Sequence, residues 1–539
     1  MLNKNKLALT SNQTVFLLVV YCLVVLNLGF WNHFFSIQQE AGYNWLLIAT
    51  MPIFLAAAMN LVFQLLFYPY WHRVFFPIVL VLGSGAAYAV MTQGIYFNAD
   101  QIVNILHTDP GEASAWISPK FVGWVLCTGV IPALLYAFGL KLKPASTTWW
   151  KGVGWRLISM VASLLVVGVV AGVAYQSYAS FFRNHKAIVH KIVPSSYLGG
   201  IVRVAYNHYE ENRPFEPIGL DAQRKVAQGA EKNVFILVVG ETTRAQNWGL
   251  NSHAPATTPQ LAAMPDVINF PDVSSCGTST AVSVPCMFSN MGRANFNDGK
   301  ARHQEGLLDI LQRAGLYVSW RENDSGCKGV CDRVKQLNII DIAPPQACKN
   351  GLCFDSTLLL NLKEEIAAMP NDGVIVLHTV GSHGPAYYDR YPVELRKFTP
   401  TCDTNQLQDC SSEQLQNTYN NTVLAVDDML AKTIQLLKNS NVNAALWYMS
   451  DHGESLGEKG MYLHGAPYVV APKEQTHIPM VFWANEGFYK AKGLNRQCLT
   501  EKSVQPYSHD HVFSSMLGVL DVSTREYKVE GDMFAACRG

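Results

Sequence analysis

Residues 234–241 read Val-Phe-Ile-Leu-Val-Val-Gly-Glu, a continuous apolar run that ends on a glycine and a carboxylate. The run is rich in β-branched residues and follows a polar Lys-Asn pair, as is typical of a strand buried on both faces of a parallel sheet. Similar apolar runs recur downstream, at Leu316–Trp320, Val374–Thr379 and Ala444–Met449. These runs predict a sheet of buried, mostly parallel strands.

Segments with helical periodicity separate the predicted strands: Gly306–Arg313, Asp355–Met369 and Leu415–Leu437. An alternation of strand and helix predicts an α/β fold in which helices cover both faces of the sheet. In such sheets the ligand site lies beyond the carboxyl ends of the strands. The residues that follow each strand are therefore the first candidates for function.

Carboxylates and histidines follow three of these strands. They are Glu241 after the first run, His383 after the third, and Asp451, His452 and Glu454 after the fourth, with His464 twelve residues after His452. Oxygen and imidazole ligands of this kind suit Zn²⁺ or Mn²⁺ rather than a thiolate site. A single Asp-His pair is a weak signal, but three polar strand ends together predict a metal site.

A hydroxyl-rich segment supplies candidates for a nucleophile. Residues 274–289 read SSCGTSTAVSVPCMFS, and Gly277 permits a tight turn before a helix. Free N–H groups at a helix N-terminus favour a phosphate, and a metal ion would lower the pKa of a coordinated hydroxyl. The spacing leaves four candidate nucleophiles open, as well as an ordinary helix cap: Thr278, Ser279, Thr280 and Ser283.

The charge is spread unevenly along the chain. Residues 1–178 carry 12 charged side chains, and the other 361 residues carry 70. The first part contains five apolar stretches: Val15–Phe35, Trp45–Phe67, Phe75–Gly94, Phe121–Leu140 and Leu157–Tyr175. Each is near the ~20 residues that a membrane-spanning helix needs. The alternative, a buried core of five soluble helices, would not be so free of charge. Residues 1–178 are therefore predicted to form a five-helix membrane domain.

The basic residues between these stretches predict the orientation. Lys4, Lys6, Arg73, Lys141, Lys143, Lys151 and Arg156 lie on one side, against Lys120 on the other. The positive-inside rule places the N-terminus in the cytoplasm and the chain after the fifth span outside. The first span lacks a small-residue cleavage signature, which predicts that it is retained. A net charge of zero argues against a nucleic-acid partner.

The twelve cysteines support this topology. Cys22 and Cys127 lie in predicted spans, and the other ten are Cys276, Cys286, Cys327, Cys331, Cys348, Cys353, Cys402, Cys410, Cys498 and Cys537. An even number outside the membrane indicates five disulfides in an oxidising compartment, although sequence leaves the connectivity open. The simplest guess pairs neighbours as 276–286, 327–331, 348–353 and 402–410, which leaves 498–537. A zinc ribbon built from the second and third pairs is the alternative.

Residues 179–230 mix aromatic and basic side chains between the two parts. This composition suits a segment along a membrane surface, and equally a plain linker. Residues 231–539 are then the predicted catalytic domain.

Four segments closely resemble those of the lipid A phosphoethanolamine transferases, inner-membrane enzymes that confer resistance to polymyxins and colistin. They are residues 238–245, 275–289, 378–385 and 450–458. The resemblance covers essentially the whole chain. It implies a multi-pass α-helical membrane domain and an α/β alkaline-phosphatase/sulfatase-like catalytic domain in the periplasm of a Gram-negative bacterium. The cysteine framework is similar too, which supports pairing of neighbours.

The resemblance also implies roles for individual residues. It makes Thr280 the nucleophile and gives one tightly bound Zn²⁺ the ligands Glu241, Thr280, Asp451 and His452. A second group would serve a second metal ion or the phosphate of the substrate, with Glu454 in an outer position: His383, His464, His378, Lys328 and Glu454.

Three residues between the third and fourth spans match the site that binds the ethanolamine headgroup of the lipid donor in this family. Asn104, Thr108 and Glu112 are spaced to share one face of a helix. Pro110 lies within this run and would interrupt a continuous helix.

The expected reaction is zinc-dependent transfer of phosphoethanolamine from phosphatidylethanolamine to a phosphate of lipid A, through a phosphoethanolamine-threonine intermediate, with polymyxin resistance as the result. The expected partners are these two lipids and the inner membrane, with no nucleic acid, and the enzyme is expected to be a monomer. Transfer to another glycan such as core heptose, or transfer of phosphoglycerol, would use the same architecture. A non-enzymatic sensor would lack ligands or nucleophile, and this chain has them all.

Overall fold

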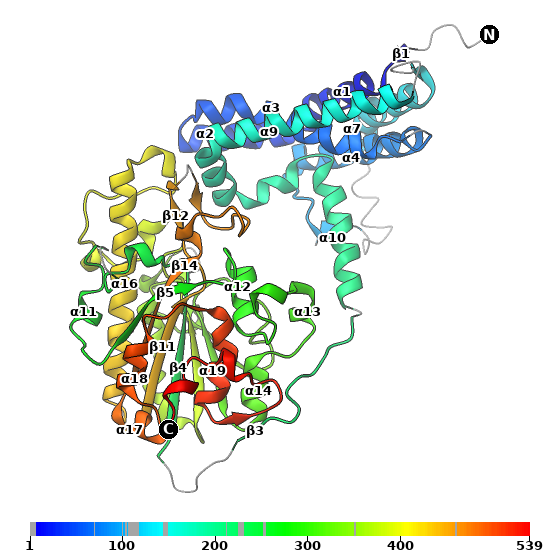
Figure 1. Ribbon diagram of the computed structural model, residues 1–539. Coiled ribbons are helices and arrows are strands. Elements are labelled where there is room, and N and C mark those ends of the chain that lie inside the picture. The colour runs from blue at the N-terminus through cyan, green and yellow to red at the C-terminus, as the bar shows by residue number, and fades with distance from the viewer. Residues whose placement is uncertain are drawn as a thin grey trace. The chain divides into compact units, whose positions relative to one another are not determined.

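The computed structural model describes residues 7–68, 70–99, 101–102, 105, 118–143, 149–211, 213–224, 231–251, 255–349, 352–458 and 461–539. The chain divides into two compact units, residues 1–212 and 213–539 (Figure 1), and residues 179–211 belong to the first. Asn104, Thr108 and Glu112 lie outside the described residues.

The first unit is a bundle of apolar helices. Within the described residues, four of them are long and apolar enough to cross a membrane, and a bent pair, Ser11–Leu26 and Leu28–Glu40, would make a fifth span if it crosses as one. The helices are α1 (Ser11–Tyr21), α2 (Leu28–Ala41), α3 (Trp45–Leu66), α4 (His72–Gln93), α7 (Pro119–Val125), α8 (Ile131–Leu134), α9 (Trp149–Asn184) and α10 (Ser195–Glu211), with π-helical turns at Cys22–Leu26, Leu126–Val130 and Leu135–Gly139. This arrangement agrees with the five predicted stretches.

The bent pair of helices changes direction by 60° at Asn27. The buried Asn27 amide donates to the carbonyl oxygens of Cys22 at 2.8 Å and Val193 at 2.6 Å, and its oxygen accepts from the Val193 N–H at 2.9 Å. Asn60 similarly donates to the Ser163 hydroxyl at 2.8 Å. These two polar side chains thus find hydrogen-bond partners within the unit, where an unsatisfied polar group would be costly.

The second unit is built on an eight-stranded sheet with the order β15-β5-β14-β11-β4-β10-β6-β7. The strands are β4 (Asn233–Gly240), β5 (Ile268–Ser274), β6 (Tyr317–Glu322), β7 (Lys335–Asn338), β10 (Gly373–His378), β11 (Asn443–Ser450), β14 (His477–Ala484) and β15 (Tyr507–Ser508). The four predicted strands are present and pair in parallel as β11-β4-β10-β6. The sheet is mixed, because β14 runs antiparallel to both neighbours.

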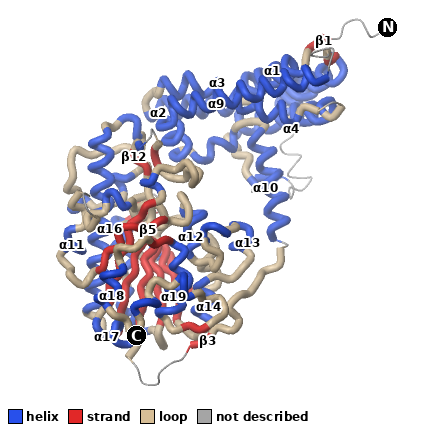
Figure 2. Tube along the Cα trace, viewed as in Figure 1, coloured by secondary structure: helices blue, strands red, loops and turns tan. Residues whose placement is uncertain are grey.

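Helices lie on both sides of this sheet (Figure 2). They include α11 (Pro259–Ala262), α12 (Thr280–Met287), α13 (Asp298–Arg302), α14 (Leu307–Arg313), α15 (Leu362–Ala368), α16 (Ser412–Lys438), α17 (Glu486–Ala491), α18 (Arg496–Lys502) and α19 (Val512–Val519). The helix predicted at Asp355–Met369 is divided into a 3₁₀ turn, Asp355–Leu359, and α15, because Asn361 adopts a left-handed conformation with φ of 56°. Every residue of β4 and β11 is buried, as their apolar sequences predict.

Five disulfides link the ten cysteines of the second unit in the neighbour pairs given above: Cys276–Cys286, Cys327–Cys331, Cys348–Cys353, Cys402–Cys410 and Cys498–Cys537. The zinc-ribbon alternative is excluded, since its four cysteines are all oxidised. Cys22 and Cys127 are free thiols in the helical unit.

Candidate active site

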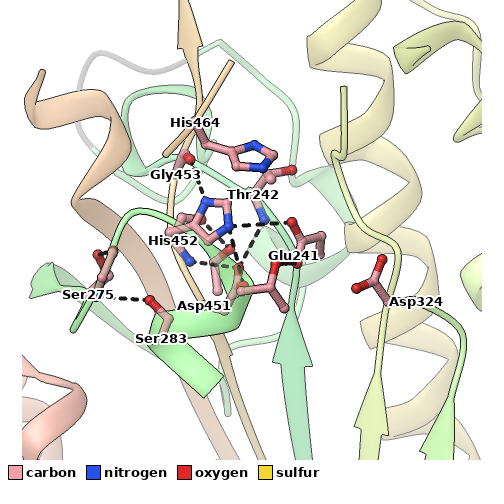
Figure 3. A network of polar contacts seen from close by, with 12 residues as sticks. Glu241, Thr242, Ser275, Ser283, Asp324, Asp451, His452, Gly453 and His464 are labelled. Atoms are coloured by element: carbon pink, nitrogen blue, oxygen red, sulfur yellow. Dashed lines mark hydrogen bonds and ion pairs between the residues drawn. The ribbon is translucent and has the colours of Figure 1, made fainter. Parts of the chain in front are cut away.

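Adjacent parallel strands bring the candidate residues together at one edge of the sheet. Gly240 of β4 pairs with Ser450 of β11, so Glu241 and Asp451 leave the sheet side by side. The backbone N–H of Thr242 donates to Oδ1 of Asp451 at 3.2 Å, which joins the two strand ends (Figure 3). The carboxyl edge of the sheet is therefore the site that the strand pattern predicts.

Three buried atoms meet here without hydrogen-bond partners among the described residues: Oε1 of Glu241, Oδ2 of Asp451 and Nε2 of His452. The imidazole nitrogen lies 3.5 Å from the Glu241 oxygen and 3.4 Å from the Asp451 oxygen. Burial, followed by the charge of Asp451, raises the pKa of Glu241 well above its usual range. Two buried carboxylates and an imidazole lone pair fit a divalent cation, which would neutralise their charge and occupy all three atoms.

Neighbouring backbone groups orient these donors. The Nδ1–H of His452 donates to the Gly453 carbonyl at 2.8 Å, so Nε2 carries the lone pair that faces the carboxylates. Oδ1 of Asp451 accepts from the His452 N–H at 2.7 Å, so Oδ2 turns toward the cluster. Contacts of this kind fix the tautomer and the orientation of metal ligands.

Thr280 is the first residue of α12, and its hydroxyl donates to Oε2 of Glu241 at 2.9 Å. The Thr278 hydroxyl instead donates to the Ala466 carbonyl at 2.6 Å, and the Ser283 hydroxyl accepts from the Gly277 N–H at 2.9 Å. Of these three candidate hydroxyls, that of Thr280 is hydrogen-bonded to the carboxylate-histidine cluster.

A second set of side chains borders the cluster. His464 pairs through Nδ1 with Oε2 of Glu454 at 2.9 Å, and the other oxygen of Glu454 accepts from the Tyr387 hydroxyl at 2.8 Å. The ring of His464 lies 5.2 Å from that of His383 and 4.5 Å from that of His452, between centroids. Ligand atoms of Glu241, His383 and His464 lie within 4.8 Å of one another, which suits a second cation or an anionic group.

His378 ends β10 and holds its Nδ1 3.0 Å from Glu322. Burial lowers the pKa of His378, but Glu322 and then Asp324 more than offset that effect, so the pKa is raised. Ligand atoms of His378, Asp324 and Glu241 lie within 4.8 Å of one another. Lys328 donates from Nζ to the Ser325 carbonyl at 2.7 Å and to its hydroxyl at 2.6 Å.

Sequence reasoning missed Asp324 and His509. Asp324 lies two residues beyond the end of β6. The expectation that functional residues follow the carboxyl ends of the strands would therefore have identified it, if that strand had been included. His509 is fully buried, its Nδ1 accepts from the Cys276 N–H at 3.0 Å, and its Nε2–H donates to the Ser450 carbonyl at 2.9 Å. Burial lowers the pKa of His509 to about 3, so the ring is neutral and joins the segment before α12 to β11.

Comparison with known proteins places this geometry in a family. Residues 233–522 match the sulfatase family model, and residues 55–209 match the model described as phosphoethanolamine transferase EptA/EptB. The chain is 42% identical to phosphoethanolamine transferase EptA of Escherichia coli K12, over 96% of this chain and 95% of the relative. This chain belongs to the phosphoethanolamine transferases. It is also 35% identical to phosphatidylethanolamine transferase Mcr-1 of Escherichia coli, over 94% of each chain.

A solved structure supports the assignment across both units. The integral membrane lipooligosaccharide phosphoethanolamine transferase A (EptA) of Neisseria meningitidis is 44% identical, with a TM-score of 0.65, and the match covers 99% of this chain and 100% of that one. The transferase is therefore a membrane enzyme of the EptA/Mcr type with a sulfatase-like catalytic unit. The resemblance, the fold class and the enzyme class predicted from sequence are confirmed.

Proposed function

We propose that this phosphoethanolamine transferase uses Thr280 as its nucleophile and transfers phosphoethanolamine from phosphatidylethanolamine to a phosphate of lipid A. The observation that carries the proposal is the hydrogen bond from Thr280 to Glu241, beside three buried atoms that have no partner among the described residues. The name of the Mcr-1 relative supports phosphatidylethanolamine as the donor.

We assign the ligands of a tightly bound Zn²⁺ to Glu241, Thr280, Asp451 and His452. When bound, the ion would lower the pKa of the Thr280 hydroxyl and offset the negative charge that develops on the phosphoryl oxygens. The nitrogen and oxygen donors and the fixed tautomer of His452 fit this ion.

In the first half-reaction, Oγ1 of Thr280 attacks the phosphorus of phosphatidylethanolamine, and the bond from phosphorus to the diacylglycerol oxygen breaks. Oε2 of Glu241 already accepts the Thr280 hydrogen bond and is positioned to take its proton. That proton ends on the departing diacylglycerol, and phosphoethanolamine remains on Thr280.

In the second half-reaction, a phosphate P–OH of lipid A gives its proton to Glu241 and its oxygen attacks the same phosphorus. The bond from phosphorus to Oγ1 of Thr280 breaks, and Glu241 returns the proton to Thr280, which regains its hydroxyl. The two substrates use one site in turn, which predicts ping-pong kinetics. We assign a second set of side chains to the phosphoryl oxygens or a second metal ion: His378, His383, His464, Glu454 behind His464, and Lys328, whose assignment rests on the family resemblance alone. The added amine offsets phosphate charge on lipid A, which weakens the attraction of cationic polymyxins to the membrane.

We propose that the catalytic unit lies in the periplasm and that Asn104, Thr108 and Glu112 bind the ethanolamine headgroup of the donor. The distribution of Lys and Arg and the five disulfides support this orientation. In α10, Val202 is 69% exposed and Tyr209 is 68% exposed, which supports a helix that lies along the membrane surface.

The test is mass spectrometry of lipid A and core oligosaccharide from Gram-negative cells that express the full-length enzyme or its Thr280→Ala variant. A gain of phosphoethanolamine on lipid A, absent with Thr280→Ala, supports the proposal. Modified core sugars with unmodified lipid A would select the glycan acceptor, and added phosphoglycerol would select the other donor.

A further inference from the structure

The loop that follows His464 ends in a pair of strongly exposed apolar side chains. Residues 465–472 read Gly-Ala-Pro-Tyr-Val-Val-Ala-Pro and contain no charge. Val469 is 94% exposed and Val470 is 56% exposed. A single exposed valine on a soluble domain is unremarkable, but two adjacent ones on an uncharged loop beside a reaction centre form a directed apolar tip.

This loop is fixed to the segment that carries the nucleophile. The Gly465 N–H donates to the Thr278 carbonyl at 2.7 Å, and the Thr278 hydroxyl donates to the Ala466 carbonyl at 2.6 Å. The Tyr468 hydroxyl donates to the Ser275 carbonyl at 3.0 Å. These contacts hold the part of the loop that precedes the tip, and the Ala466 N–H also donates to Oε1 of Gln475, which follows the tip, at 3.1 Å. Since the loop is held in this way, the exposure of the two valines is a built feature of the rim of the active site.

Basic side chains flank the tip. The guanidinium of Arg293 lies 3.3 Å from the ring centroid of Tyr468, directly before Val469, and Lys473 directly follows the loop. Both basic residues are exposed. An apolar tip between cations matches the chemistry of a bilayer surface, which has an acyl layer beneath anionic headgroups.

We infer that the Val469–Val470 tip inserts into the lipid bilayer and holds the active site at the level of the lipid headgroups. The inference rests on the proposed function, because both proposed substrates are bilayer lipids. The loop that carries His464 also carries the tip, so insertion would set the height of the reaction centre above the acyl layer. The catalytic unit is tethered to membrane helices, so the tip meets the bilayer at a high effective concentration. For this reason a contact of only two residues can bias the orientation of the unit.

A depth measurement tests the insertion without relying on activity. The full chain, with Cys127→Ser to remove the exposed free thiol, receives Val469→Cys and a nitroxide label and is reconstituted in vesicles of phosphatidylethanolamine and phosphatidylglycerol. Val529→Cys is the matched control, because Val529 is 62% exposed in the same unit. We expect the label at 469 to be several-fold more accessible to oxygen, relative to a water-soluble nickel complex, than the label at 529. Equal accessibility of the two labels to oxygen would overturn the inference. It would also be overturned if the label at 469 entered the bilayer only after a second protein was added to the vesicles.

A kinetic comparison of two donors separates the effect of the tip on membrane contact from any effect on the reaction itself. We expect the Val469→Asp/Val470→Asp variant to lose at least tenfold in kcat/KM on vesicle phosphatidylethanolamine, while activity on a monomeric dihexanoyl analogue stays within twofold. Val529→Asp should change neither. An equal loss on both donors, or no loss on either, contradicts the inference. If the label is immersed but the wild type cleaves neither donor, the proposed function fails and the membrane contact stands.

Discussion

The hydroxyl of Thr280 donates a hydrogen bond to Oε2 of Glu241 at 2.9 Å, while Oε1 of the same carboxylate lies 3.5 Å from Nε2 of His452. One side chain therefore faces the proposed nucleophile with one oxygen and the imidazole of His452 with the other. Because Glu241 directly follows β4, the sheet fixes the position at which its carboxylate accepts the Thr280 hydrogen bond.

Removal of the Thr280 hydroxyl should abolish transfer without unfolding the protein. We expect Thr280→Ala to reduce kcat by about a thousand-fold or more, because the attacking atom is lost. Thr280→Ser keeps that atom and should retain measurable activity. Intact mass of enzyme quenched with donor alone should show a phosphoethanolamine adduct on the wild type, and an adduct of equal yield on Thr280→Ala would contradict the assignment.

Removal of the metal ion should destabilise the catalytic unit. A ligand present at a thousand times its Kd stabilises the folded state by about 4 kcal/mol, so a chelator should lower Tm and added Zn²⁺ should restore it. Asp451→Asn weakens one of three buried donors, and we expect purified Asp451→Asn protein to contain less zinc and its Tm to respond little to chelator. Wild-type protein with no bound metal and a Tm indifferent to chelator would rule out the zinc site.

Two substitutions at His509 separate its two hydrogen bonds. Glutamine can keep the donor to the Ser450 carbonyl, and asparagine can keep the acceptor for the Cys276 N–H. If His509 positions the nucleophile loop, the asparagine variant should retain more activity, and the glutamine variant should lose about 10²-fold in kcat with little change in KM. Both variants with normal kcat and only a lower Tm would show that His509 has a structural role alone.

The buried imidazole of His509 also predicts the response to acid. Its pKa is lowered from 6.5 to about 3 in the folded protein, so the unfolded chain binds more protons between these values and stability falls as pH decreases through that window. The effect is about 2 kcal/mol at pH 5. His509→Asn lacks the titrating group, so its Tm should fall less than that of the wild type between pH 7.5 and pH 5. Parallel Tm curves would contradict the assignment.

The ends of the strands were predictable because each buried parallel strand is a short apolar run followed by polar residues. This pattern located Glu241 and Asp451. The role of His509 was not predictable, since its two partners lie 233 and 59 residues away in sequence and no local signal marks a tertiary hydrogen bond. The antiparallel direction of β14 also depends on long-range pairing rather than on composition. The 60° bend at Asn27 was not predictable either, since the partner of the Asn27 amide, Val193, lies 166 residues later in sequence.

The disulfide between Cys276 and Cys286 spans the turn that carries Thr280, with a sequence separation of 10. The Cys498–Cys537 disulfide closes a separation of 39 in the C-terminal region. A longer closed loop constrains the unfolded chain more, so Cys498→Ser/Cys537→Ser should cause the larger fall in Tm. Cys276→Ser/Cys286→Ser should cause the larger fall in kcat, about tenfold or more, because it releases the nucleophile from its turn. The two double variants should therefore rank in opposite order by stability and by activity. The same order in both measurements would mean that the first disulfide stabilises the fold without positioning Thr280.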